Sequence, residues 1–344
     1  MKKLLIQLLA ITVLTGCKTT HVSDGKTSVT IKQNKNFLAA YKMIKADDLK
    51  KNLYVIASDE MEGRDTGSPG QKKAGEYMVN YYKNLGISYP KALDSYYQKV
   101  PSEFMKKRGG GNLPDSENIL AFIEGSEKPE EIVVISAHYD HVGTKKGVVY
   151  NGADDDGSGT VAVMEIAKAF QEAKKAGKGP KRSILFLHVT GEEHGLFGSE
   201  YYSEHPVFPL ANTVVDLNID MIGRDDPANR GKQYVYVIGS DMLSSELKVI
   251  NEAANKRTNN LELNYKYDDL NDPQQLYYRS DHYNFAKNNI PVAFFFDGIH
   301  EDYHKPTDKP DKIDYPLLEK RTQLVFATAW DIANRAERIV VDRK

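Results

Sequence analysis

The chain has 344 residues, of which 40% are hydrophobic and 27% charged, and its formal net charge at pH 7 is −2. This composition is typical of a globular protein without an acidic or basic tail, so we expect no nucleic-acid partner. Cys17 is the single cysteine of the sequence, which argues against an intrachain disulfide and a cysteine-ligated zinc site. A metal site in this chain must therefore use histidine and carboxylate ligands.

The N-terminal residues 1–17, MKKLLIQLLAITVLTGC, predict a signal peptide. A positively charged start precedes an apolar stretch at 4–14 that is too short to span a bilayer. The closing letters LTGC resemble the lipobox of bacterial lipoproteins, in which the cysteine is acylated and becomes the mature N-terminus. We therefore expect the protein to be anchored to a lipid bilayer of the cell envelope through Cys17, on an extracytoplasmic face. A plain signal peptide is the alternative.

The next segment, 18–36, is polar and short of large apolar side chains, which predicts a flexible tether. Residues 37–344 then form one predicted domain, near the upper size for a single hydrophobic core.

Within this domain, apolar runs alternate with longer amphipathic segments. The runs predict strands at 131–140, 182–191, 212–223, 233–239 and 290–298. The amphipathic segments predict helices at 70–85, 157–174, 196–204, 241–258, 281–289 and 313–337. Such alternation favours the α/β class, specifically a three-layer α/β/α sandwich with a mostly parallel, mixed central sheet.

Acidic and histidine residues follow the predicted strands at their carboxyl ends. Because ligands of open α/β sheets bind outside the carboxyl ends of strands, these side chains are expected to meet at one edge of the sheet. They are His138, Asp140, Glu192, Glu193, Asp220 and His304.

The segment NGADDDGSGT at 151–160 lies between the first two of these strands. Alone it would predict a helix cap with a tight turn, but its position favours a ligand role. Two histidines with three carboxylates suit two zinc ions that share one carboxylate, and a bridging hydroxide would make the site neutral. One glutamate of the pair at 192–193 would bind metal, and its neighbour would stay free as a general base.

The motifs SAHYDHVG, NGADDDGSG, TGEEHGLFGS, LNIDMIGR, YRSDHYNF and EDYHKPTD together resemble the co-catalytic di-zinc aminopeptidases. This family includes bacterial leucyl aminopeptidases and aminopeptidase Y and is related to glutamate carboxypeptidase and the glutaminyl cyclases. The resemblance runs from about Leu53 to about Ile313 and implies a zinc-exopeptidase-like fold with two Zn²⁺ per chain. The implied ligands are His138 and Asp220 for one zinc, Glu193 and His304 for the other, and Asp155 as the bridge, followed by a cis peptide bond to Asp156.

The resemblance also implies three supporting roles. Glu192 matches the general base, Tyr303 is a candidate to stabilise the oxyanion, and Asp140 is expected to accept the second ring N–H of His138. Each has a structural alternative, since Asp140 could be a turn residue and Tyr303 could simply pack. His141 and His300 lie near these motifs and are expected at the site entrance.

The functional prediction is a di-zinc aminopeptidase that hydrolyses N-terminal residues from peptides with free N-termini. Only about twenty residues separate Gln98 from Asn118, so we expect no protease-associated insertion before the metal-binding strands. Two alternatives stay open: a glutaminyl cyclase-like acyltransferase, and a non-catalytic, lipid-anchored binding module on the same scaffold. The presence of Glu192 argues against the binding module, which would not need a base.

Overall fold

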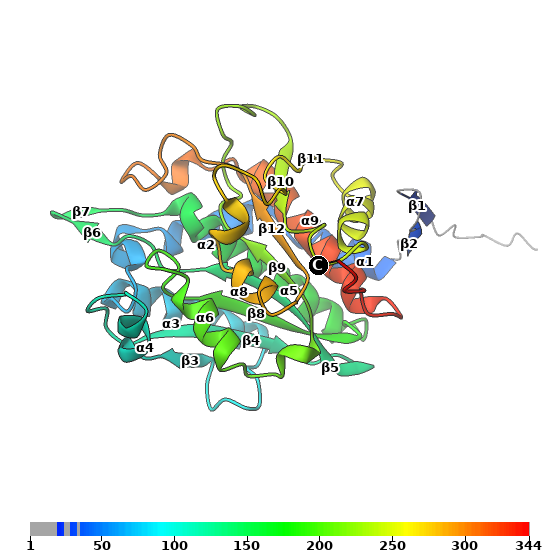
Figure 1. Ribbon diagram of the computed structural model, residues 1–344, viewed down its shortest axis with the longest axis horizontal. Helices are drawn as coiled ribbons and strands as arrows, with labels where there is room; N and C mark the ends of the chain where they lie inside the picture. The colour runs from blue at the N-terminus through cyan, green and yellow to red at the C-terminus, as the bar shows by residue number, and fades with distance from the viewer. Residues whose placement is uncertain (1–18, 24–27, 33–34, 344) are drawn as a thin grey trace, which may run out of the picture.

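The computed structural model describes residues 19–23, 28–32 and 35–343. Its centre is an eight-stranded sheet made of β3 (Tyr97–Val100), β4 (Ser116–Ile123), β5 (Lys128–His138), β8 (Arg182–Val189), β9 (Thr213–Ile219), β10 (Tyr234–Ile238), β11 (Glu262–Asn264) and β12 (Val292–Phe296). The strand order is β11-β10-β12-β9-β5-β8-β4-β3 (Figure 1).

The middle of this sheet is parallel and its flanks are mixed. Strands β12, β9, β5 and β8 run parallel to one another, whereas β10 pairs antiparallel with β12, and β4 with β8. Every residue of β8, RSILFLHV, is buried. Strands covered on both faces read as continuous apolar runs, which is why the sequence pattern located them. The predicted mostly parallel, mixed sheet is confirmed.

Helices cover both faces of the sheet. One face carries α1 (Lys35–Tyr41), α2 (Ala46–Ile56), α3 (Pro69–Leu85), α5 (Gly159–Lys175), α7 (Leu247–Arg257) and α9 (Tyr315–Asn334), and the other carries α6 (Phe197–Glu204) and α8 (His282–Ala286). Alternate residues of β5 serve the two layers: Val133 and Ile135 belong to the first core, and Val134 to the second. Figure 1 shows α6 and α8 in front of the sheet and α9 behind it. The three-layer prediction is therefore confirmed.

Several elements were not predicted from the sequence. These are α2, the antiparallel strands β3 and β4, the edge strand β11, the short α4 (Ser102–Lys107) beside β3, and the hairpin of β6 (Thr144–Lys145) and β7 (Val148–Val149). Short helical turns lie at Asp59–Arg64, Ala153–Ser158, Leu210–Asn212, Leu276–Tyr278 and Pro310–Lys312.

The segment at 18–36, predicted to be a tether, contains regular structure in its described part. Strands β1 (Thr19–Ser23) and β2 (Ser28–Lys32) form an antiparallel hairpin beside α7, and α1 begins at Lys35. Both strands are rich in threonine and valine, which favour extended backbone. The prediction of a tether rested on the polar composition of the segment and did not take this preference into account. The division into leader, tether and domain stays a prediction, and Cys17 lies outside the described residues.

Within residues 19–23, 28–32 and 35–343, no helix combines the length and the apolar character needed to cross a bilayer.

Candidate metal centre

The predicted site residues converge at the carboxyl edge of the parallel strands. His138 is the last residue of β5, Asp220 directly follows β9, and Glu193 lies in the turn after β8. His304 comes from the loop after β12, and Asp155 from the turn before α5. Segments far apart in the sequence thus meet in one cluster, because parallel strands end at the same edge.

Two groups of potential ligand atoms meet at the Asp155 carboxylate. In the first, His138 Nε2 lies 3.2 Å from Asp155 Oδ1 and 3.6 Å from Asp220 Oδ1. In the second, His304 Nε2 lies 3.0 Å from Asp155 Oδ2 and 3.0 Å from Glu193 Oε2. The two oxygens of Asp155 therefore face different groups, as required of a carboxylate that two metal ions share.

The cluster combines potential metal ligands with a negative electrostatic field, and both favour the binding of cations. His138 Nε2, Asp155 Oδ2 and Glu193 Oε1 are buried and make no hydrogen bond within the described residues. Burial lowers the pKa of His138, but the surrounding carboxylates outweigh it and hold the pKa well above its usual value. In the same way, burial opposes the rise of the His304 pKa, yet Asp155 and Glu193 raise it to about 10. Imidazole and carboxylate ligands in a strongly negative field fit divalent metals such as zinc.

The three aspartates of the DDDG motif have different partners. Asp154 Oδ1 accepts a hydrogen bond of 2.7 Å from the Gly223 N–H, and Asp156 Oδ1 accepts one of 3.1 Å from the Met221 N–H. Both bonds join the turn at Ala153–Ser158 to the chain just after β9. They leave Asp155, the middle residue, to face the cluster. The peptide bond between Asp155 and Asp156 is cis, as the resemblance implies.

Two further side chains hold the ligand candidates in place. Ser280 Oγ donates a hydrogen bond of 2.7 Å to Asp220 Oδ2. The buried carboxylate of Asp308 accepts hydrogen bonds from the Asp154 N–H (3.0 and 3.1 Å) and the Asp155 N–H (3.2 Å). Burial, reinforced by the Asp154 carboxylate, raises the pKa of Asp308 to about 6. Neither Ser280 nor Asp308 was singled out from the sequence.

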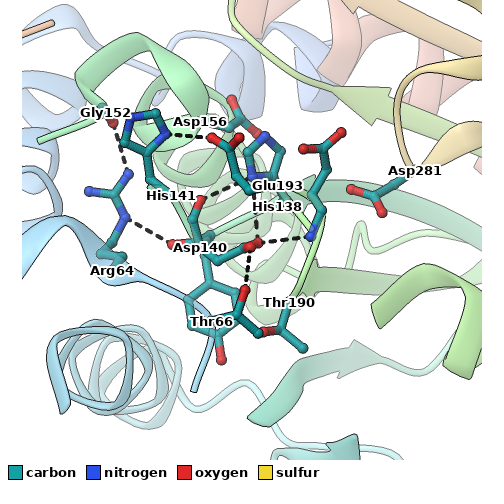
Figure 2. Close-up of polar contacts among 12 residues, drawn as sticks. Arg64, Thr66, His138, Asp140, His141, Gly152, Asp156, Thr190, Glu193 and Asp281 are labelled. Atoms are coloured by element: carbon teal, nitrogen blue, oxygen red, sulfur yellow. Dashed lines mark hydrogen bonds and ion pairs between the residues drawn. The ribbon is translucent and has the colours of Figure 1, made fainter. Parts of the chain in front are cut away.

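Asp140 lies buried under the cluster and contacts several elements (Figure 2). The His138 Nδ1 atom lies 3.1 Å from the Asp140 backbone oxygen and 3.7 Å from its carboxylate Oδ1. The nearer acceptor is thus the backbone carbonyl, where the resemblance implied the carboxylate. That carboxylate accepts hydrogen bonds from Thr66 Oγ1 (2.8 Å) and the Glu192 N–H (3.3 Å). Asp140 therefore links the end of β5 to the turn that carries the glutamate pair.

A recess opens beside the cluster. Glu192 and Tyr303 line it together with Asp155 and Asp220. Burial raises the pKa of the Glu192 carboxyl well above its usual value and also raises the pKa of the Tyr303 phenol. The remaining lining is mostly apolar and consists of Met221, Leu276, Arg279, Phe294, Phe296 and Ile299. A small polar corner beside an apolar wall is typical of a ligand-binding pocket.

The two histidines expected at the entrance are instead inside the protein. His141 is 0% exposed and His300 is 4% exposed. His141 Nδ1 lies 2.7 Å from Glu193 Oε1, and His300 Nε2 lies 3.1 Å from Asp154 Oδ2. Nearness to the motifs in sequence could not tell whether these rings point outward or inward.

Arg64 holds the backbone on which the cluster is built. Nothing in the sequence except its charge marked it as a residue of the site. Its buried guanidinium donates hydrogen bonds to four carbonyl oxygens, those of Tyr139 (2.8 Å), Asn151 (2.7 Å), Gly152 (2.8 Å) and Ile56 (2.8 Å). Figure 2 shows Arg64 reaching toward Gly152 on one side and toward the backbone beside Asp140 on the other. The side chain thereby fixes the backbone that precedes Asp155 relative to the backbone that follows His138.

An open α/β sheet with histidine and carboxylate groups gathered at its carboxyl edge is the arrangement of metal-dependent hydrolases on an α/β scaffold. Residues 118–329 match the model of Peptidase family M28. Since the match covers more than half of the sequence, the chain belongs to this family.

Comparison with individual proteins agrees with this membership. A probable leucine aminopeptidase from Arthroderma otae is 29% identical over 223 residues, which cover 63% of this chain and 57% of that protein. The LapA aminopeptidase structure from Legionella pneumophila has a TM-score of 0.69 at 19% identity and covers 98% of this chain and 81% of its own. The glutaminyl cyclase structure from Porphyromonas gingivalis has a TM-score of 0.62 at 17% identity, with coverages of 83% and 97%.

At these identities the two structures confirm the predicted fold. The chain spans only part of the curated relatives it matches, from 10% to 57% of their lengths.

Proposed function

We propose that this chain is a zinc-dependent aminopeptidase with two zinc ions per chain. The observation that carries the proposal is the Asp155 carboxylate, whose two oxygens face separate histidine–carboxylate groups. His138 and Asp220 would hold one zinc, Glu193 and His304 the other, and Asp155 both. The probable leucine aminopeptidase of Arthroderma otae and the LapA aminopeptidase of Legionella pneumophila support the same activity.

Glu192 is the general base of the proposed reaction. Zinc ions bound at the cluster would lower the pKa of a water molecule and polarise the peptide carbonyl. Glu192 lines the recess beside the cluster and is not needed as a ligand. Burial raises its pKa, which strengthens it as a proton acceptor, while the positive charge of zinc ions bound beside it would favour its ionised form. Its carboxylate takes the proton from the attacking water and delivers it to the leaving amine.

Tyr303 is the proposed donor to the oxyanion. Its ring stacks on His304 with a centroid separation of 3.9 Å, and its side chain lines the same recess. Because burial raises the phenol pKa, the hydroxyl stays protonated and can donate to the oxygen on which negative charge develops.

The recess also indicates how the substrate N-terminus is bound. Its apolar wall favours an apolar N-terminal side chain over a charged one. An aminopeptidase needs a carboxylate near the metals to bind the free amine of its substrate. Asp302 is engaged by Lys312 at 2.7 Å, and Glu301 pairs with Arg230 at 3.4 Å. Glu192 lines the recess itself, so we assign the amine to the space beside it.

The test is mass spectrometry of a peptide pool incubated with the zinc-loaded protein that lacks residues 1–17. The pool contains peptides with free, acetylated and glutamine N-termini, and the Glu192→Gln variant is the matched control. We expect stepwise loss of N-terminal residues from free peptides, fastest for apolar ones, and no loss from acetylated peptides. Loss of ammonia from the glutamine peptides alone would instead show a cyclase, and an unchanged pool would point to a binding module.

We also propose that the protein is a lipoprotein of the cell envelope, anchored through acylated Cys17. The support is the sequence LTGC directly after an apolar stretch. Replacing Cys17 with alanine should release an active protein from the membrane fraction. A Cys17→Ala protein that stays in that fraction would contradict the anchor.

A further inference from the structure

A third histidine lies among the atoms of the second metal group. His141 Nδ1 is 2.7 Å from Glu193 Oε1 and 3.7 Å from Asp155 Oδ2, and Figure 2 shows its ring turned toward the Glu193 carboxylate. His141, Asp155 and Glu193 form a compact group of possible metal ligands, just as His138, Asp155 and Asp220 do. No role at the metals was assigned to His141 from its sequence position.

The contacts of His141 resemble those of a ligand more than those of a hydrogen-bond donor. Although its Nδ1 is close to Glu193 Oε1, both atoms are buried without a hydrogen bond among the described residues, because the ring N–H direction does not fit. His138 Nε2 has the same character, since it lies between carboxylate oxygens at 3.2 and 3.6 Å and makes no hydrogen bond. Two ligands of one tetrahedral zinc lie about 3.3 Å apart, and the two distances at His141 straddle this value.

The surrounding backbone is shaped to hold the His141 ring. The His141 N–H donates a hydrogen bond of 3.1 Å to the Arg64 carbonyl oxygen. Gly152 packs against the ring, and a Cβ atom at this position would lie 2.5 Å from His141 Cγ and Cδ2. Gly152 also has a φ of 53°, which a residue with a side chain adopts only with strain. The Arg64 guanidinium binds the Gly152 carbonyl, so one side chain fixes this cradle.

We propose that His141 is a ligand of the second zinc, together with Asp155, Glu193 and His304. That zinc would then have four protein ligands, whereas the first zinc would have three, from His138, Asp155 and Asp220.

Charge and exposure are consistent with this asymmetry. A neutral imidazole adds a ligand without adding charge, so the site with two zinc ions and three carboxylates stays as close to neutral as before. His304 lies on a loop and its side chain is 39% exposed, whereas His141 is fully buried. His141 therefore supplies a rigid ligand where His304 supplies an accessible one, and the second zinc should be the more tightly bound.

The decisive measurement is the number of imidazole ligands per zinc, by X-ray absorption of the wild-type protein loaded with two equivalents of zinc. Three histidines on two zinc ions give 1.5 imidazoles per zinc, and two histidines give 1.0. We expect 1.5 for wild type and 1.0 for His141→Ala. A control, His194→Asn, removes an exposed ring that is bonded to Asp65 and should leave the value at 1.5.

Zinc affinity, measured by competition with a chelator, provides the second readout. His141→Ala should weaken the tighter zinc by more than about 100-fold, beyond the 10–100-fold typical of residues that only orient a ligand. His141→Asn keeps a hydrogen-bond donor near Glu193 and should be no better than alanine. Rescue by asparagine would make His141 a positioning residue and overturn the assignment.

The assignment of His141 rests on the proposed two-zinc function, so the measurements must distinguish a failure of the assignment from a failure of that function. Wild-type protein that binds two zinc ions, cleaves peptides and shows 1.0 imidazole per zinc would overturn the role of His141 and leave the function intact. Wild-type protein that cannot bind a second zinc would overturn both.

Discussion

Replacing Arg64 with lysine should loosen the backbone that carries the metal ligands. Arg64 donates four hydrogen bonds of 2.7–2.8 Å to buried carbonyls on both sides of the cluster. A lysine ammonium is a single nitrogen and cannot reproduce the planar fork of a guanidinium. We therefore expect at least two of the four carbonyls to lose their partner.

The expected magnitude follows from the burial of these groups. Each buried carbonyl left without a partner costs about 1–3 kcal/mol, so the Arg64→Lys protein should lose about 2–6 kcal/mol of unfolding free energy. The zinc affinity should also fall, by roughly 10–100-fold, because the backbone beside His138 and Asp155 is no longer fixed. Urea unfolding of metal-free protein measures the first effect without a contribution from bound metal, and chelator competition measures the second.

Arg182→Lys is the matched control. Arg182 is also fully buried and is the first residue of β8, far from the carboxyl edge of the sheet. It donates hydrogen bonds to the carbonyl oxygens of Ile332 (2.8 Å) and Arg335 (2.7 Å). The Arg182→Lys protein should lose unfolding free energy and keep its zinc affinity. If Arg64→Lys and Arg182→Lys bind zinc equally well, Arg64 does not position the ligands. If Arg64→Lys unfolds like wild type, the four hydrogen bonds contribute nothing measurable.

Three further outcomes are expected. Glu192→Gln should retain both metals and lose roughly 10²–10⁴-fold in kcat, whereas Glu193→Ala should lose metal as well; equal metal contents in the two proteins would contradict this division of roles. Tyr303→Phe should lower kcat by roughly 10²–10³-fold with little change in KM, and an unchanged kcat would reduce Tyr303 to a packing residue. Acid should destabilise the fold through His188, because burial lowers its pKa to about 3, so that below pH 6.5 the unfolded chain takes up a proton that the folded protein does not. This single group should cost about 2 kcal/mol of unfolding free energy between pH 7 and pH 5, and His188→Gln should lack that component; parallel stability curves for wild type and variant would contradict the linkage.

The central strands could be read from the sequence, whereas the antiparallel flank could not. Strands β8, β9 and β12 are buried along their whole length, as is the second half of β5, so apolar residues dominate each of them. Strand β3 is short, and β4 begins with polar residues. In the sheet β3 pairs with β4, and β4 pairs with β8. Pairing of this kind depends on contacts distant in sequence, which composition and periodicity do not report.

The sequence by itself indicated a set of candidate metal ligands and the edge of the sheet at which they would meet. His138, Asp220 and the glutamates follow apolar strands directly, and parallel strands bring their carboxyl ends together. This much depends on short-range pattern and on a general property of the α/β class.

The tertiary structure alone decided which atoms face one another. Asp155 presents its two oxygens to different histidines because Asp308 holds the backbone N–H groups of the turn and the flanking aspartates bind the chain after β9. His141 points into the cluster because its N–H is bonded to the Arg64 carbonyl oxygen and because Gly152, which lacks a side chain, leaves room for its ring. These bonds join residues that are far apart in the chain, so local sequence could not reveal them.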